Sequence, residues 1–245
     1  PHVNYPTIFP AINLVYSDKT NDYQVGSNIY RRYRFFAGGL TRLSARFLTN
    51  NRSRLITVFF YPAGFQHVFN RSIAPLANCF TLMEKIDPGG APELLEKVLS
   101  EKTTDKRVTL LDNYFLDHLS VSSKEIPNID RAVAIILMRQ SSIRVKHIAA
   151  ELEISERTLR RNFNREMGMS VKEFIDIARI NFASVLLTSN PDVPVIKLIH
   201  KLGFYDQSHF LKHLKKYVGV STGDFKKLSN TFLAHYSDIE TSNPL

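Results

Sequence analysis

The sequence is poor in the residues that mark several large classes of protein. Its 245 residues include one cysteine, Cys79, and no tryptophan. A single cysteine excludes an intramolecular disulfide and indicates a reducing compartment. No apolar run approaches the roughly 18 residues of a membrane-spanning helix, and no stretch resembles a signal peptide. We therefore expect a cytoplasmic protein with no membrane partner, in which Cys79 is a small core residue or, as the alternative, a redox sensor.

Motifs for catalysis, metal binding and nucleotide cofactors are missing as well. The chain has no phosphate-cradling glycine loop and no dinucleotide fingerprint. His209 and His213 are four residues apart, a spacing that suits zinc, but no glutamate lies between them and no cysteine is near. His67 has no nucleophile or paired carboxylate in its sequence context. The sequence therefore predicts no enzyme activity, no metal and no cofactor.

The charge of the chain favours a polyanionic partner. There are 32 lysines and arginines against 23 aspartates and glutamates, which gives a formal net charge of +9. The excess is spread evenly, because residues 1–125 hold 15 basic and 11 acidic residues (+4) and residues 126–245 hold 17 and 12 (+5). Composition alone therefore suits nucleic acid but does not locate a site.

The last hundred residues contain an internal repeat. At an offset of 51, the matching pairs are Leu159 with Phe210, Phe163 with Leu214, Gly168 with Gly219, Ser170 with Ser221, and Phe174 with Phe225. Upstream the offset is 50, and the pairs are Val145 with Val195, Ile148 with Leu198, and Leu152 with Leu202. The second unit therefore has one extra residue in its turn. Two small, basic, repeated helical units point toward DNA.

Each unit has the apolar spacing of two short helices around a sharp turn, which is a helix-turn-helix. Ser155 is placed to cap the second helix of the first unit, and Asp206 does the same in the second unit. The second helix of each pair has one apolar stripe and one polar face that can enter the major groove. The polar faces carry Arg157, Arg160 and Arg161 in the first unit, and Gln207, Ser208, His209 and Lys212 in the second.

A long helix is predicted between the two units. Ser170 and Glu173 form a capping box, and helical spacing continues until Pro191. From Val171 to Asn190 such a helix spans about 30 Å, close to the roughly 34 Å between successive major-groove faces of B-DNA. One chain is therefore expected to present two reading helices to adjacent grooves.

These residues resemble the AraC/XylS family of transcription regulators. The resemblance covers about residues 126–228 and is carried by Gly203-Phe204-Tyr205-Asp206-Gln207-Ser208-His209-Phe210, with Lys212, Lys215, Gly219, Ser221 and Phe225 following. The first unit matches the same family from Ile148-Ala149 through Ser155, Leu159, Arg161, Phe163 and Gly168-Met169-Ser170. The sequence departs from the pattern at Leu214, where an aromatic residue is usual, and at Thr222, where proline is usual. Both changes keep a core or turn role.

The resemblance implies which side chains contact DNA. The base-reading positions would be Arg157, Arg160, Arg161, Gln207, Ser208 and Lys212. Arginine suits guanine and glutamine suits adenine, because each can form two hydrogen bonds to the base edge. Lys197, Lys215 and Lys216 are the candidates for phosphate contacts, with a solubilising role as the alternative.

The amino-terminal part has a different residue composition and hydrophobic pattern. Short segments rich in β-branched and aromatic residues predict strands at residues 12–16, 29–36, 43–48 and 55–61. The apolar spacing of residues 91–119 predicts helices, which would form a helical bridge between the two domains. The polar stretch 120–128 is the expected domain boundary. The segment 59–65, continuing through Phe69 and Leu76, is similar to an uncharacterised sensor-like domain found upstream of AraC-type modules. The many aromatic residues suit a compact core or, alternatively, an effector pocket.

We therefore predict an α+β protein with a mostly-β amino-terminal domain, a helical bridge and an all-α double helix-turn-helix domain. The expected limits are 1–122 for a sensor or dimerisation domain (β-rich 1–81, helical 91–119), 126–228 for the DNA-binding domain and 229–245 for a polar tail. The expected function is a transcription regulator, more an activator than a repressor, that binds double-stranded DNA. By resemblance it would recruit RNA polymerase, respond to a small molecule and self-associate as a homodimer. Two alternatives stay open: an architectural DNA-binding protein whose amino-terminal domain only dimerises, and an enzyme regulated by DNA.

Overall fold

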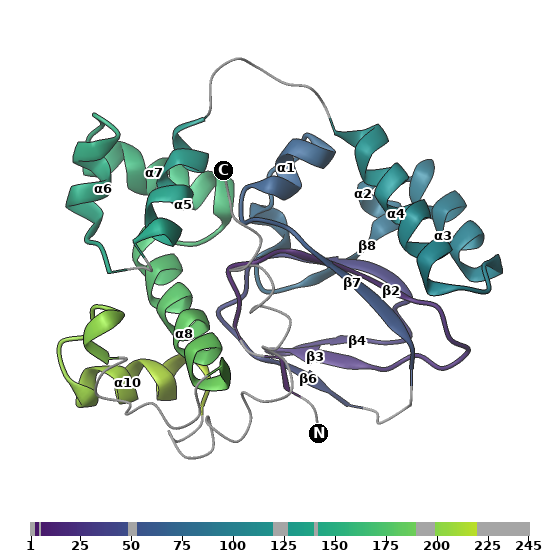
Figure 1. The fold of residues 1–245 in the computed structure, drawn as a ribbon, viewed down its shortest axis with the longest axis horizontal. Helices are drawn as coiled ribbons and strands as arrows, with labels where there is room; N and C mark the ends of the chain where they lie inside the picture. Colours follow the sequence, from purple (N-terminus) through teal and green to yellow (C-terminus); the bar gives the residue numbers. More distant parts are fainter. Residues whose placement is uncertain are drawn as a thin grey trace.

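The computed structural model describes residues 3–4, 6–48, 53–119, 127–139, 142–189 and 199–219. Two β-sheets and several helices make up the amino-terminal part, and the described carboxy-terminal residues are helices and their connections (Figure 1). The predicted α+β class, with strands first and a helical module last, is confirmed.

The strands form two four-stranded antiparallel sheets. One sheet has the order β1-β6-β3-β4, with strands Val3–Asn4, Ala45–Phe47, Tyr23–Val25 and Asn28–Tyr30. The other has the order β7-β2-β5-β8, with strands Leu55–Phe59, Ala11–Val15, Phe35–Gly38 and Phe80–Leu82. Apart from the β3-β4 hairpin, neighbouring strands in each sheet come from separated parts of the sequence, so mostly long-range pairing builds this domain.

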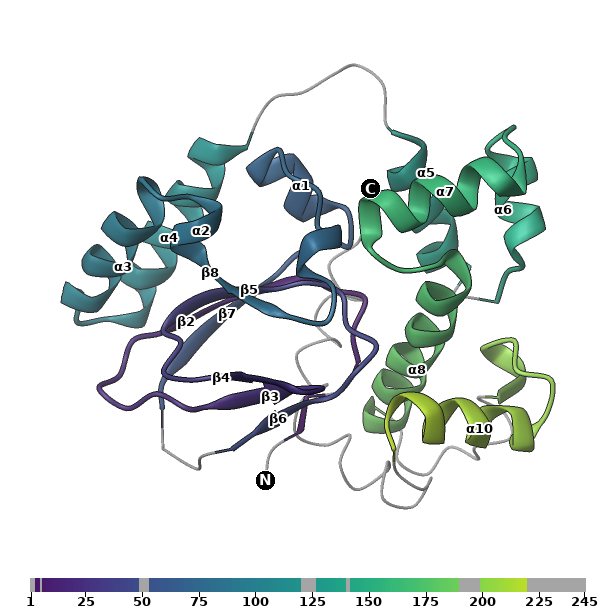
Figure 2. The same ribbon diagram turned by 180° about the vertical axis from the view of Figure 1, so that it is seen from behind.

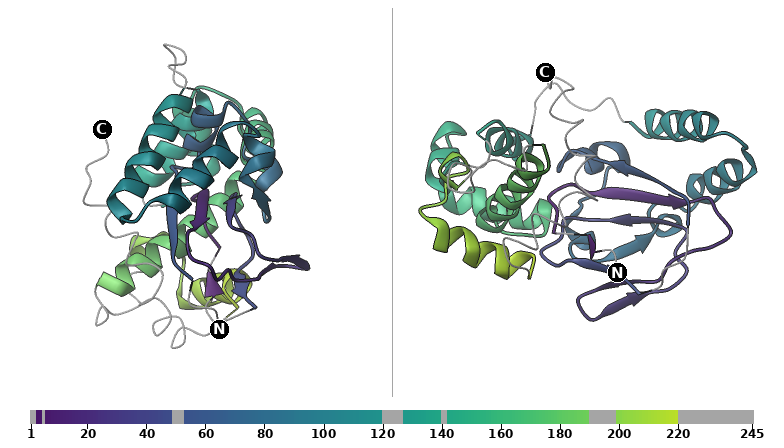
Figure 3. Two further views of the ribbon diagram at one scale, coloured as in Figure 1. Left: turned by 90° about the vertical axis from the view of Figure 1, so that its right-hand side faces the viewer. Right: turned by 60° about the horizontal axis from the view of Figure 1, so that its bottom comes forward.

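The second sheet is covered on both sides (Figures 1 and 3). Along β5, Phe36 packs with Tyr23 and Tyr30 of the first sheet, whereas Phe35 and Ala37 join the main core that includes the helices. This alternation follows from the two-residue period of a strand. The aromatic side chains of Tyr23, Phe36 and their neighbours pack against one another, as the core interpretation of the sequence predicts.

Helices follow and interrupt the strands of this domain. They are α1 (Gly64–Phe69), the 3-10 helix η1 (Ala74–Leu76), α2 (Met83–Ile86), α3 (Gly90–Ser100) and α4 (Thr104–His118). Asp87 ties the last two together, because it accepts hydrogen bonds from the Gly90 N–H at 3.1 Å and the Tyr114 hydroxyl at 2.8 Å. In Figure 1, α3 and α4 lie at the far end of the molecule from the carboxy-terminal helices. The helical segment thus connects the domains in sequence rather than in space.

The carboxy-terminal part is organised around one long helix. Its helices are α5 (Asn128–Met138), α6 (Val145–Glu151), α7 (Glu156–Met167), α8 (Val171–Ser189) and α10 (Gln207–Tyr217). The 19 residues of α8 span about 29 Å. Figures 1 and 2 both show α7 near one end of α8 and α10 near the other. The predicted long helix is therefore present, and α5 precedes the first helix-turn-helix unit.

The amino-terminal strands differ from the sequence prediction at two places. The segment 29–36, expected as one strand, is broken between β4 and β5. Arg32 has a left-handed backbone (φ 55°), and its N–H donates to Asp22 Oδ1 at 3.1 Å. This turn transfers the chain from one sheet to the other, which hydrophobic alternation alone does not reveal. Strands β1, β3 and β8 were not predicted, and none of them is longer than three residues.

Cys79 is not the fully buried core residue that composition suggests. Its thiol is partly exposed, donates weakly to the Pro75 carbonyl at 3.4 Å and lies beside the aromatic cluster of the two sheets. Burial nevertheless raises the pKa of the thiol, which lowers its thiolate fraction. The redox-sensor alternative for Cys79 therefore has no support from its environment.

Several predictions fall outside the described residues. They are the boundary segment 120–126, the tail 229–245, Lys197, Thr222, and the repeat positions Val195, Leu198, Ser221 and Phe225. Within the described ranges, no helix has the length and apolar character needed to cross a membrane. Among the described residues, no three histidine, cysteine, aspartate or glutamate side chains lie close enough together to hold a metal ion.

Candidate nucleic-acid interface

The turns of the two repeated units have the same backbone hydrogen bonds. In the first unit Glu153 N–H donates to the Ala150 carbonyl at 3.1 Å, and Ile154 N–H donates to Ala149 at 3.0 Å. The equivalent bonds of the second unit join Gly203 to His200 at 3.1 Å and Phe204 to Ile199 at 3.0 Å. Glu153 and Gly203 both have left-handed backbones, with φ of 56° and 72°. The repeat seen in the sequence is thus a repeat of local structure.

The second helix of each unit begins at a side-chain cap. Ser155 Oγ accepts from the Thr158 N–H at 3.0 Å at the start of α7, and Asp206 Oδ1 accepts from the His209 N–H at 2.7 Å at the start of α10. These bonds satisfy backbone donors that a helix leaves free at its first turn. The extra residue of the second unit is Tyr205, which is 86% exposed directly before the cap.

The outer face of α7 carries a continuous polar stripe. Arg157, Arg160, Arg161 and Asn164 are spaced by three, one and three residues, which puts them on one side of the helix, and all four are exposed. The opposite side is buried through Leu159, Phe163 and Met167. Arg160 pairs with Glu156 at 2.8 Å, an exposed pair worth only about 0.3–0.5 kcal/mol that DNA can displace. Asn164 was not among the predicted contact residues, although the same helical spacing indicates it.

The outer face of α10 has the same spacing with a different chemistry. Ser208, Leu211, Lys212 and Lys215 form its stripe, and Gln207 is exposed at the first turn. Leu211, which is 37% exposed, was also missed; an apolar side chain in this position suits a thymine methyl group. Lys216 is less free than expected, because its Nζ lies 3.0 Å from the Tyr217 hydroxyl.

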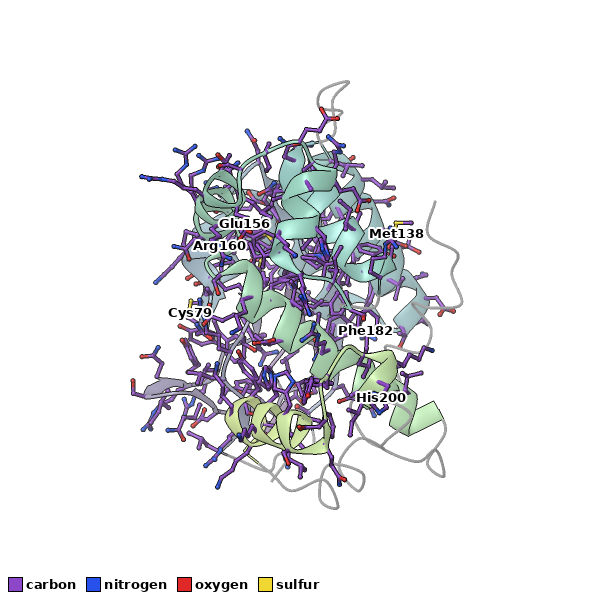
Figure 4. All side chains as sticks on the ribbon, turned by 90° about the vertical axis from the view of Figure 1, so that its left-hand side faces the viewer. Cys79, Met138, Glu156, Arg160, Phe182 and His200 are labelled. Carbon is purple, nitrogen blue, oxygen red and sulfur yellow. The ribbon has the colours of Figure 1, made fainter. Side chains whose placement is uncertain are left out.

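Figure 4 looks onto the side of the molecule where these two helices lie. Glu156 and Arg160 mark the start of α7, and His200 marks the second unit near α10. The two stripes lie on different helices, and α8 packs against both of these helices. The arrangement suits two separate contacts with an elongated partner.

A buried polar cluster lies beneath α10. Asp176 of α8 is 4% exposed, and its carboxylate lies 3.7 Å from His213 Nδ1, 3.8 Å from Arg179 and 3.5 Å from the Tyr217 hydroxyl. Burial raises the pKa of Asp176. Burial, followed by the positive potential of His209, Arg179, Lys216 and Lys172, lowers the pKa of His213 to about 4. His213 is therefore neutral at neutral pH.

We expect acidification to loosen the packing of α10. An unfolded histidine takes up a proton near pH 6.5, whereas folded His213 does so only near pH 4. Stability linked to neutral His213 is therefore fully present above about pH 6.5 and is lost as the pH falls toward 4. His213→Leu should remove about 2–3 kcal/mol of this pH dependence in chemical denaturation between pH 7 and 4. His147→Leu, at an exposed position of α6, is the control; equal pH profiles for wild type and His213→Leu would contradict the assignment.

The amino-terminal domain contacts the corner where α7 ends and α8 begins. Arg42 donates from Nη2 to the Gly168 carbonyl at 2.8 Å and from Nε to Glu173 Oε1 at 2.8 Å. Ser72 Oγ donates to the carbonyls of Arg165 and Glu166, the last turn of α7, at 3.3 and 3.1 Å. Glu173 also completes the predicted capping box, because its Oε2 accepts from the Ser170 N–H at 3.0 Å.

The charge of Glu173 is stabilised at this corner. Burial alone would raise the pKa of its carboxyl, but hydrogen bonds from the Ser170 hydroxyl, the Ser170 N–H and the Arg42 guanidinium together lower it to about 2. Glu173 is therefore ionised across the physiological range. The corner we name the Arg42 junction comprises Arg42, Ser72, Gly168 and Glu173.

Two further contacts join the domains. Asn181 of α8 is 5% exposed, and its side-chain amide donates to the Pro6 carbonyl at 2.9 Å while its Oδ1 accepts from the Ile8 N–H at 3.3 Å. His67 of α1 lies 2.7 Å from Asp130 of α5. The apolar core runs without interruption from Ile8 through α8 to α10. The amino-terminal domain and α8 thus pack as one body.

Comparison with known proteins also identifies a helix-turn-helix domain in the carboxy-terminal part of the chain. Residues 148–228 match the family described as a helix-turn-helix domain. The Msm operon regulatory protein of Streptococcus mutans is 32% identical over 120 residues, which cover 48% of this chain and 43% of the relative. The HTH-type transcriptional activator RhaR of Salmonella dublin is 26% identical over 117 residues, 48% of this chain and 41% of the relative. The chain thus covers less than half the length of these relatives.

A solved structure extends the likeness to both domains. ToxT from Vibrio cholerae, bound to (E)-4-(8-methylnaphthalen-1-yl)but-3-enoic acid, superposes with a TM-score of 0.56 over 93% of this chain and 93% of its own. The two sequences are 13% identical. At that identity the likeness shows a shared two-domain fold.

Proposed function

We propose that this chain, which has an AraC-type helix-turn-helix module in its carboxy-terminal part, is a regulator of transcription that reads two adjacent major grooves of double-stranded DNA. The α7 helix would enter one groove and α10 the next, and the bound protein would recruit RNA polymerase as an activator. Arg157, Arg160, Arg161, Gln207, Ser208 and Lys212 would contact bases. Lys215, Lys216 and Lys197 would contact phosphates.

The observation that carries the proposal is the pair of exposed stripes on α7 and α10, two helices that both pack against α8. Each stripe lies opposite a buried face, so its polar side chains are held outward on a fixed helix. The α8 helix spans about 29 Å, near the roughly 34 Å that separates adjacent major-groove faces. The different chemistry of the two stripes predicts an asymmetric site, with guanines favoured under α7.

Arg161→Ala is expected to lower affinity for the preferred site by about 1–3 kcal/mol while leaving random DNA nearly unaffected. Arg161 has no ion pair with any carboxylate of the described residues, so its guanidinium is available for a guanine edge. The measurement is an equilibrium titration of both DNAs with wild type and variant.

The contrasting variant is Lys215→Ala, whose exposed ammonium would serve phosphates. The Lys215→Ala variant should lose the same affinity on both DNAs. The slope of the logarithm of the binding constant against the logarithm of the salt concentration should become less steep by about one unit. Equal losses of affinity for Arg161→Ala on the two DNAs would show that Arg161 contacts only the phosphate backbone of DNA.

The direct test of function is selection of double-stranded DNA from a random pool by the whole chain at near-physiological salt. Recovery of a two-part motif with centres about one helical turn apart is the expected result. A pool without any motif would contradict sequence-specific binding by two helices.

We also propose that a small molecule bound by the amino-terminal domain modulates this binding. The support is the shared fold with ToxT, which has been solved with a butenoic acid bound. A change in the affinity for the selected site on adding a small organic acid would support this role. Affinity that stays constant over a panel of such acids would count against it.

A dimerisation platform is the second candidate role for the amino-terminal domain. The α4 helix exposes Val108 and Leu116, and its C-cap residue Leu119 is exposed as well; 40%, 65% and 48% of their surfaces are accessible. Val108 and Leu116 are eight residues apart and lie on the same face of the helix. Concentration-dependent self-association that Leu116→Lys abolishes would favour a homodimer.

A further inference from the structure

We propose that Arg42 is the positioning residue through which the amino-terminal domain controls α7 and leaves α10 outside its control. The inference rests on the proposed function, in which α7 and α10 each read one half of the DNA site. Under it, a change in the amino-terminal domain alters recognition of the α7 half-site alone.

A single guanidinium spans the corner between two helices. Gly168 ends α7, and Glu173 lies in the first turn of α8; Arg42 bonds to both at 2.8 Å. A cation is favoured at the carboxy-terminal end of a helix, where carbonyl groups point outward. The side chains of Arg42 and Glu173 are 28% and 31% exposed, so the pair is partly shielded from water. The angle between α7 and α8 is therefore held by a group from another domain.

Arg42 is itself fixed within the amino-terminal domain. Its N–H donates to Asn78 Oδ1 at 2.7 Å, and the Asn78 N–H donates to the Leu40 carbonyl at 3.0 Å. Gly39, on the same connection, donates to Leu76 at 3.2 Å. Leu76 belongs to η1, which packs against α7. Movement of the connection between β5 and β6 is thus transmitted to both contacts with α7.

Within the described ranges, α10 has no comparable connection to the amino-terminal domain. Among the described residues, no hydrogen bond or ion pair joins α10 to the amino-terminal domain. The polar partners of α10 on another helix lie on α8, with Asp176 at 3.7 Å from His213 and 3.5 Å from Tyr217. The apolar side of α10 is buried through Phe210, Leu214 and Tyr217. The two reading helices are therefore held differently, although their sequences repeat.

The test measures the affinity of the full chain for three DNAs: the selected site, the site with one half scrambled, and the site with the other half scrambled. Arg161→Ala identifies the half under α7, because its loss disappears when that half is scrambled. Arg42→Ala should weaken binding to the selected site about five- to tenfold, a typical loss for a partly exposed charged hydrogen bond. The same loss of affinity should be seen on the DNA in which the half-site under α10 is scrambled. It should disappear on the DNA in which the half-site under α7 is scrambled.

Two further variants make the test specific. Arg42→Lys keeps the charge but lacks the planar fork that bonds a carbonyl and a carboxylate at once, so its loss should be intermediate. Arg46→Ala removes an exposed arginine from the neighbouring strand β6 and should change nothing. Thermal unfolding is recorded for each protein; if Arg42→Ala does not fold, Arg42→Lys and Ser72→Ala take its place in the same comparison.

The outcomes separate the inference from the proposed function. A loss confined to the α7 half supports the role of Arg42. Equal losses on all three DNAs, or no loss from any junction variant, would overturn it. A wild-type chain that does not prefer the selected site over random DNA would instead refute the proposed function.

Discussion

Gly168→Ala is expected to lower the free energy of unfolding by about 3–4 kcal/mol, which combines backbone strain with a clash between domains. Gly168 has φ of 67°, a conformation that costs other residues about 1 kcal/mol or more. A Cβ atom there would lie 2.7 Å from the Ala74 carbonyl oxygen and 2.8 Å from Ala77 Cβ. Neither atom can rotate away, so the domains must separate slightly at the Arg42 junction.

Gly26→Ala is the matched control for that variant. Gly26 also has a positive φ, at 60°, but an added Cβ would meet only the end of the Leu43 side chain at 3.0 Å. Because Leu43 is exposed and can rotate, only the backbone cost of about 1 kcal/mol is expected. Urea denaturation of the three proteins measures the difference. Equal losses for the two variants would mean that the η1 contact with Gly168 is not tight in solution.

Asn181→Leu is expected to destabilise the chain by about 3 kcal/mol, because it leaves two buried backbone groups without partners. The Asn181 amide bonds both the Pro6 carbonyl and the Ile8 N–H, and Ile8 is completely buried. Leucine has the same branched shape but is somewhat larger, so the loss reports missing hydrogen bonds with some overpacking and no cavity. Chemical denaturation gives the stability, and limited proteolysis should show earlier cleavage near Pro6.

The control for Asn181→Leu is Asn113→Leu, on the exposed side of α4. Its expected change is within about 0.5 kcal/mol, as for most surface substitutions. If Asn181→Leu were as mild as the control, the segment before β2 would not be held by α8 in solution.

The carboxy-terminal module was largely predictable because its signals are local. The repeat, the caps at Ser155 and Asp206, and the capping box of Ser170 with Glu173 all act within a few residues, and the structure has each of them. The exposed stripes follow from the same helical period. Their contacts with DNA stay a prediction.

The domain contacts could not be predicted, because they join residues far apart in the chain. Arg42 and Glu173 are 131 residues apart, and Pro6 and Asn181 are 175 apart. No periodic pattern in one sequence encodes such a pair. The sheets show the same limit, because strand order depends on long-range pairings such as β1 with β6. The turn at Arg32 has a left-handed backbone, and the arginine in the sequence gives no indication of that conformation.

The α8 helix has a consequence for how binding sites can change over time. Its 19 residues are packed against both helix-turn-helix units and the amino-terminal domain, so it can neither lengthen nor unwind to follow DNA. One inserted base pair between the half-sites would rotate one of them by about 34° around the duplex axis. If the two units read adjacent grooves as proposed, the promoter can change by base substitution, whereas selection would remove insertions and deletions in its spacer.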